Sequence, residues 1–248
     1  IQFAIKDEEL FILEANPRAS RTMPFVAKVT GNQIIKAGTL LMLGYSIDEV
    51  RNKTKYLSSS SNKVAIKKAI FPWSRFPAED TMLGPEMKAT GEVLGVGKEF
   101  GTALNKAYAA AGVEINNKEK GIFVTLSDSE KPNFIQTVNK YLELGFTLYS
   151  TEGTGKFLKT NGIDSVIVGK ADDLGQTSLT IIEDKLVSLV INTPTYANEL
   201  SDGWKIRRLS HETGVAVVSS VREADAFIEA FLNQNLVLDD LEVIQDVS

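Results

Sequence analysis

The pattern of apolar and polar positions changes near residue 118. Before that point, strand-like apolar runs at 3–5 and 10–13 flank an acidic turn at 7–9, which predicts a β-hairpin. Stop signals and apolar spacing predict helices, one further strand and a Gly-rich connector in the rest of this part. The helices are expected at 24–29, 34–43 and 100–111, the strand at 64–71 and the connector at 84–97.

After residue 118, short apolar runs alternate with helical periods, which predicts a parallel sheet covered on both faces. The runs lie at 122–126, 146–149, 165–168, 186–191 and 215–218. The helical periods lie at 130–144, 154–161, 204–213 and 221–233, and part of 172–184 is expected to be helical as well. We therefore predict an α/β chain with two domains, 1–118 and 119–248, the second an open doubly wound sheet.

Composition narrows the possible functions. The chain has 248 residues, 27 Lys and Arg against 32 Asp and Glu, a net charge of −5, one His and no Cys. A nucleic-acid surface is disfavoured because phosphate neutralisation needs clustered cations. Disulfides, thiolate nucleophiles and Cys-ligated metals are excluded, and a Ser-His-Asp triad would depend on His211 alone. No apolar run approaches the roughly 20 residues of a membrane span, so a cytoplasmic protein is expected.

The stretch that follows the first hairpin carries candidate metal ligands. In a strand, residues two apart share a face, so Glu14 and Asn16 project together, and Gln2 on the partner strand can lie beside Glu14. One carboxylate and two amide carbonyls suit Mg²⁺, and Arg18 and Arg21 add guanidinium groups for a phosphate. The alternative is the polar side of a half-exposed strand, which the spacing alone favours.

A second candidate site lies in the α/β part. Thr151-Glu152-Gly153-Thr154-Gly155 follows the strand at 146–149 and opens a helix, so it can present N–H groups and hydroxyls to an anion. By itself, this stretch is more simply explained as a Gly-rich turn with a Thr at the N-cap.

Four further residues follow strand ends or open helices of the same sheet: Lys131, Lys170, Asn192 and Thr193. Each one alone is expected to be an ordinary surface residue. Together with Thr151 and Thr154, they would form a cationic, hydroxyl-rich rim at the carboxyl ends of the strands, suited to a phosphomonoester.

Three motifs carry a family resemblance. The stretch 13–25, LEANPRASRTMPF, resembles the metal strand of ATP-grasp enzymes, most closely that of carbamoyl-phosphate synthetase large subunits. The stretches 71–77 and 83–93 are similar to the same family. The resemblance covers nearly the whole chain. It implies the end of the second ATP-grasp half, followed by an allosteric domain with a methylglyoxal-synthase-like fold.

The resemblance also implies an activity for the intact protein. It would make carbamoyl phosphate from bicarbonate, glutamine-derived ammonia and two ATP, with a glutaminase small subunit, for arginine or pyrimidine synthesis. Gln2 and Glu14 match ATP and metal positions, Asn16 a metal position, and Arg18 and Arg21 the phosphate-side arginines; the metal is Mg²⁺ or Mn²⁺. Because Ile1–Ile5 already reads as a strand, we expect a fragment that begins inside a domain. The family's other nucleotide contacts lie upstream of the metal strand, so we expect this chain not to turn over ATP alone.

The matching allosteric positions are Lys131, Thr151, Thr154, Lys170, Asn192 and Thr193, and the family's ligands are UMP and IMP. The chain departs from the ornithine-regulated pattern at Lys68, Val218 and Ser219, so we expect no response to ornithine. In the nucleotide site it departs at Pro194, where the family has a Thr after Asn-Thr. Two alternatives stay open. One is a stand-alone effector-binding module that can self-associate, and the other is a different ATP-grasp ligase.

Overall fold

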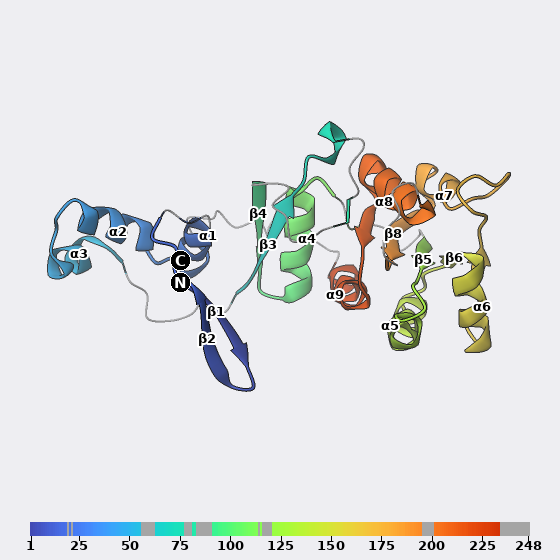
Figure 1. Cartoon of the computed structure of the whole chain (residues 1–248), viewed down its shortest axis with the longest axis horizontal. Helices are drawn as coiled ribbons and strands as arrows, with labels where there is room; N and C mark the ends of the chain where they lie inside the picture. Colours follow the sequence, from blue (N-terminus) through green and yellow to red (C-terminus); the bar gives the residue numbers. More distant parts are fainter. Residues whose placement is uncertain are drawn as a thin grey trace. The chain divides into compact units, whose positions relative to one another are not determined.

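The computed structural model describes residues 1–18, 20, 22–55, 63–76, 81–82, 91–113, 115, 121–194 and 201–233. These residues form two compact units, one within 1–62 and the other within 63–236, and each is described by itself. Figure 1 labels their elements.

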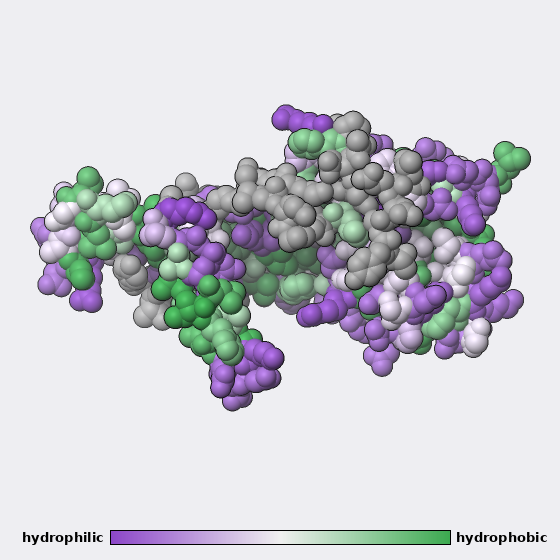
Figure 2. Space-filling view, viewed as in Figure 1, coloured by the Kyte–Doolittle hydropathy of each residue, from purple (hydrophilic) through white to green (hydrophobic). Residues whose placement is uncertain are grey.

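The first unit opens with the predicted hairpin. Strands β1 (Gln2–Lys6) and β2 (Glu9–Glu14) pair antiparallel. Asp7 and Glu8 both have positive φ angles, of 51° and 65°, as a tight two-residue hairpin turn requires. Apolar side chains on this hairpin are exposed, and Figure 2 shows them along the strands, with hydrophilic residues at the turn.

In the described part of this unit, three helices follow the hairpin: α1 (Thr22–Thr30), α2 (Ile34–Met42) and α3 (Ile47–Lys53). The sequence patterns predicted α1 and α2 but missed α3. Its signal is a capping box, in which the Ser46 hydroxyl accepts from the Glu49 N–H and the Glu49 carboxylate accepts from the Ser46 N–H.

The second unit begins with an antiparallel pair, β3 (Val64–Ile70) and β4 (Gly91–Gly97), a short 3₁₀ turn η1 (Trp73–Arg75), and helix α4 (Phe100–Ala110). The prediction of a connector over 84–97 is wrong for residues 91–97, which form β4. Two of the glycines that suggested a loop, Gly95 and Gly97, are required by packing against α4: a Cβ on Gly95 would lie 2.5 Å from the backbone nitrogen of Ala107, and one on Gly97 2.8 Å from that of Ala103.

The rest of this unit is the predicted α/β domain. Among the residues that the structure describes, five parallel strands lie in the order β7-β6-β5-β8-β9. They are β5 (Gly121–Thr125), β6 (Leu148–Ser150), β7 (Val166–Ile167), β8 (Val187–Asn192) and β9 (Ala216–Val218). The helices are α5 (Lys131–Glu143), α6 (Glu152–Thr160), α7 (Thr180–Glu183), α8 (Asp202–Thr213) and α9 (Val221–Leu232).

Both faces of this sheet are packed, as a doubly wound fold requires. Along β5, Ile122 and Val124 join a core with residues of α4, α5, α6 and α9. Phe123, between them, joins a second core with residues of α7 and α8. The predicted fold class is therefore confirmed, and the carboxyl ends of β5, β6 and β8 share one edge of the sheet.

The close approach of α4 to β4 yields a stability prediction. We expect Gly95→Ala to lower the free energy of unfolding by about 1–3 kcal/mol, because the added methyl group meets helix backbone that cannot move aside. Gly91→Ala, in the same strand, is the matched control, since among the described residues its Cβ would meet Ile70 at an ordinary 3.6 Å. Equal denaturation midpoints for the two variants would contradict this packing account.

Candidate functional site

A cleft of about 600 Å³ lies at the carboxyl edge of the parallel sheet. Its walls come from the ends of β5 and β6, the first turn of α6, the segment after β7 and the first turns of α8. The residues that line it are Thr125, Thr151, Glu152, Gly153, Ile167, Val168, Gly169, Lys170, Asp173, Ser178, Asp202, Gly203 and Ile206. Two of the predicted site residues, Thr151 and Lys170, are among them.

The helix at this cleft begins slightly earlier than predicted. α6 starts at Glu152, with Thr151 at the N-cap, so Thr154 lies within its first turn. The Thr151 side chain makes no capping hydrogen bond and instead donates to Thr154 Oγ1 over 3.3 Å. An anion at this helix start would therefore meet N–H groups that the Thr151 side chain does not cap.

Lys170 provides a positive charge beside this helix start. Its side chain is exposed, and its backbone N–H donates to Asp173 Oδ2 over 2.7 Å. The pKa of Glu152 is lowered mainly by its hydrogen bond and charge interaction with Lys156, with a smaller contribution from the charge of Lys170. Lys170 thus acts electrostatically on the first turn of α6.

Thr154 and Thr193, predicted as ligand contacts, are buried and bind the protein's own backbone. Thr154 Oγ1 accepts a hydrogen bond from the N–H of Leu126 over 3.1 Å. Thr193 Oγ1 accepts from the N–H of Ser127 over 2.7 Å. Both threonines therefore fix the loop that leaves β5.

The two remaining predicted residues also have protein partners. Lys131 Nζ lies 2.6 Å from Asp128 Oδ1, an ion pair that lowers the pKa of Asp128. Asn192 is buried and its Oδ1 accepts from Arg207 Nη1 over 2.7 Å. Arg207, a buried cation on α8, was missed from the sequence because its helical position resembles that of any surface arginine.

The hairpin brings the predicted metal ligands together. Gln2 pairs with Glu14 across the hairpin, and Asn16 Nδ2 donates to Glu14 Oε1 over 2.8 Å. All three side chains are exposed, and their oxygens are the hard donors that Mg²⁺ or Mn²⁺ prefers, so the residues fit such an ion. Arg18 is exposed directly after this set, and Arg21 lies outside the described residues.

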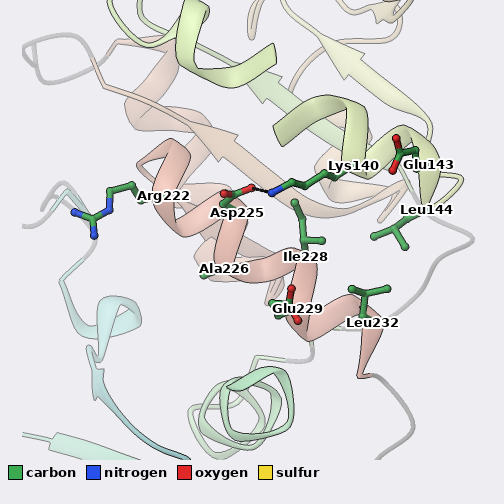
Figure 3. A pocket seen from close by; sticks show the side chains of 9 residues that line it. All are labelled: Lys140, Glu143, Leu144, Arg222, Asp225, Ala226, Ile228, Glu229 and Leu232. Atoms are coloured by element: carbon green, nitrogen blue, oxygen red, sulfur yellow. Dashed lines mark hydrogen bonds and ion pairs between the residues drawn. The ribbon is translucent and has the colours of Figure 1, made fainter. Parts of the chain in front are cut away.

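A second hollow lies between α5 and α9 (Figure 3). Leu144, Ile228 and Leu232 are among its apolar lining residues, and Lys140 forms a 3.0 Å ion pair with Asp225 at its edge. The close-up shows Arg222 directed away from this ion pair. None of the predicted site residues lines this groove.

Lys68, one of the departures from the ornithine-regulated pattern, is partly buried where β3, α4 and α9 meet. Its Nζ lies 3.9 Å from the ring centroid of Tyr108, a close cation–π contact. Burial lowers the pKa of Lys68, and the charge of Glu223 opposes that shift. Burial, assisted by Glu223, raises the pKa of Tyr108. The ammonium group of Lys68 thus occupies the ring face of Tyr108.

The sequence alone predicts that His211 is an ordinary residue on a helix surface, but it lies close to this junction and is half-buried. Its ring centroid is 5.8 Å from that of Trp73, which itself stacks on Phe71. Burial, and then the positive charges of Lys68, Arg208 and Arg207, lower the pKa of His211 to about 4. The imidazole is therefore neutral in the folded protein near pH 7.

Comparison with known proteins first identifies the class of the α/β domain. Residues 133–219 match the family described as "MGS-like domain". None of the described helices is long and apolar enough to cross a membrane.

The particular relatives are carbamoyl phosphate synthases. The chain is 37% identical over 238 residues to the "Carbamoyl phosphate synthase large chain, C-terminal section" of Methanocaldococcus jannaschii, covering 93% of this chain and 38% of the relative. The protein of the same name from Aquifex aeolicus is 37% identical over 244 residues, covering 93% and 45%. The large chain of Brucella suis is 40% identical over 238 residues, covering 93% and 20%.

These similarities confirm the family resemblance that the motifs indicated. The chain spans less than half the length of each of these three relatives.

The lowered pKa of His211 predicts how stability depends on pH. Its folded pKa of about 4 lies below its ordinary value of 6.5, so the unfolded chain binds more protons between these values. This contribution to stability is fully present above pH 6.5 and falls as the pH drops toward 4, by at most about 1.4 kcal/mol per pH unit. The substitution His211→Gln removes this pH-dependent contribution to stability.

Urea unfolding of both proteins at several pH values between 4 and 7.5 measures the difference. The carboxylates titrate in both proteins, so their effect cancels when the two curves are subtracted. We expect the wild-type protein to lose more stability than the variant as the pH falls from 6.5. Parallel curves would contradict the burial of a neutral imidazole.

Proposed function

We propose that the α/β domain binds a nucleoside monophosphate, of the UMP or IMP type, through its phosphate, and that this ligand regulates a carbamoyl phosphate synthase large chain. The observation that carries the proposal is the convergence of Lys170, Thr151 and the start of α6 on one cleft. A phosphate there would accept hydrogen bonds from helix N–H groups and interact with the Lys170 ammonium. The proposal applies equally if the domain works as a stand-alone module.

We propose further that the hairpin belongs to the site that phosphorylates carbamate. Glu14, Gln2 and Asn16 would hold Mg²⁺ or Mn²⁺, which neutralises charge on the phosphates of ATP when bound. Arg18 and Arg21 would act on the same phosphates. The intact protein would use bicarbonate, ammonia from a glutaminase small subunit and two ATP, for arginine or pyrimidine synthesis. The 248-residue chain by itself would not turn over ATP.

The first test removes the positive charge of Lys170 from the cleft. Lys170→Ala should weaken UMP and IMP binding by roughly 10- to 150-fold, because a charged hydrogen-bond donor contributes about 1.5–3 kcal/mol. Isothermal titration of the full chain measures this change. Lys159→Ala is the matched control, since it removes one exposed Lys from the last turn of the same helix, α6. An unchanged affinity in Lys170→Ala would overturn the proposed site.

Two ligand controls belong to the same titration. Uridine lacks the phosphate and should bind far more weakly than UMP. Ornithine should give no signal, because the Lys68 ammonium already covers the Tyr108 ring and repels a second cation. Tight ornithine binding would contradict this part of the proposal.

The second test concerns the hairpin in the intact enzyme. Glu14→Ala should abolish ATP formation from ADP and carbamoyl phosphate, a reaction that isolates carbamate phosphorylation. Glu14 is the only charged ligand of its set, so its loss removes most of the attraction for the metal. Glu9→Ala, at the far end of the same strand, should keep a near-normal rate. Near-normal rates in Glu14→Ala would exclude the metal assignment.

A further inference from the structure

One buried hydroxyl in the cleft is not explained by the fold. Ser178 is only 1% exposed and lines the cleft, yet its Oγ has no hydrogen-bond partner within the part of the chain that the structure describes. A buried polar atom without a partner destabilises a protein, so each one needs an explanation. A ligand that supplies the missing partner is such an explanation.

The position of Ser178 is fixed by its backbone. Its N–H donates to the carbonyl of Gly169 over 3.0 Å, and the Gly169 N–H donates to the carbonyl of Gln176 over 3.0 Å. These bonds close the base of the loop 170–176, which also carries Lys170. Ser178 is therefore held rigidly on the same wall of the cleft as the proposed phosphate-binding lysine.

Apolar and acidic residues also line this cleft. Val168 and Ile206 provide buried apolar surface, and Glu152, Asp173 and Asp202 provide carboxylates. Asp173 Oδ2 accepts from the N–H of Lys170, and Glu152 lies in the first turn of α6, so carboxylates occur beside the proposed phosphate position as well. A second anionic group on the ligand would be repelled by these carboxylates, whereas a neutral ring or sugar with polar edges would not.

We propose that the Ser178 hydroxyl hydrogen-bonds the neutral part of a nucleoside monophosphate, its base or its sugar, and so helps to select the ligand. This inference rests on the proposed function, because it assumes that the phosphate lies at Lys170 and the start of α6. The ligand class it names is a phosphomonoester that carries a polar, uncharged group.

The hydroxyl is covered in the ligand-free cleft, so contact requires the adjacent loop to shift. The loop is suited to such a shift: its tip is exposed, with a fully exposed Leu174 and a positive φ of 96° at Gly175. Lys205 of α8 holds it through an ion pair of 2.7 Å to Asp172, whose side chain is exposed. Exposed ion pairs contribute little stability, so an entering ligand can displace this one.

Ser178→Ala tests the inference. In calorimetric titrations of the full chain, we expect IMP affinity to fall about 3- to 10-fold, as for the loss of one neutral hydrogen bond. Binding of inorganic phosphate, measured by competition, should stay unchanged. The melting temperature of the ligand-free variant should stay the same or rise, because an unpartnered hydroxyl has been removed. Ser178→Cys, of similar volume, should show the same loss of IMP affinity.

Ser188→Ala is the matched control. Ser188 is also a buried serine whose Oγ has no partner among the described residues, but it lies in β8 and does not line the cleft. Its removal should leave IMP affinity unchanged.

The outcomes separate the two proposals. If Lys170→Ala weakens IMP binding but Ser178→Ala does not, the role of Ser178 is overturned and the phosphate site stands. If Ser178→Ala weakens phosphate and IMP equally, or lowers the melting temperature, Ser178 is not a contact to the neutral part. If neither variant weakens IMP binding, both proposals fail.

Discussion

Two buried hydrogen bonds help to hold the carboxyl edge of the parallel sheet together. The N–H groups of Leu126 and Ser127, just after β5, donate to the hydroxyls of Thr154 in α6 and Thr193 after β8. These bonds add to the backbone hydrogen bond from the Thr193 N–H to the Thr125 carbonyl, so three neighbouring strand ends are fixed to one another. Because a buried N–H without a partner is costly, loss of either hydroxyl would free the loop and deform the cleft. The proposed phosphate site depends on this frame, since the first turn of α6 and Lys170 can converge only if the strand ends keep their places.

The site was only partly predictable from the sequence. Strand–helix alternation predicted which residues would follow strand ends, and parallel strands bring such residues to one edge, so Thr151 and Lys170 could be foreseen. The pattern could not tell a threonine that lines the cleft, such as Thr151, from threonines whose hydroxyls bind a backbone N–H, such as Thr154 and Thr193, because all of them follow strand ends. Arg207 and Ser178 escaped notice for a related reason, since their burial depends on how α8 and the loop 170–176 close over the sheet.

Rules that use only neighbouring residues in the sequence predicted correctly the features that depend only on those neighbours. The alternation of residues along a strand was enough to bring Glu14, Asn16 and Gln2 together in a two-stranded hairpin. The same rules failed at β4, where Gly95 reads as a loop residue but serves the close packing of α4, a contact between different elements. A glycine within an apolar run can indicate a loop or a strand residue that another element packs against closely. Only the element that packs there distinguishes the two cases.

The central claim is that a phosphomonoester binds at the start of α6. An amide NMR titration of the chain with inosine 5′-monophosphate tests it most directly, because each backbone N–H reports its own environment. We expect the amide signals of Gly153, Thr154 and Lys170 to shift together and to saturate at one dissociation constant. Signals that stayed in place at saturating ligand, or largest shifts from the groove between α5 and α9, would contradict phosphate binding at this helix start.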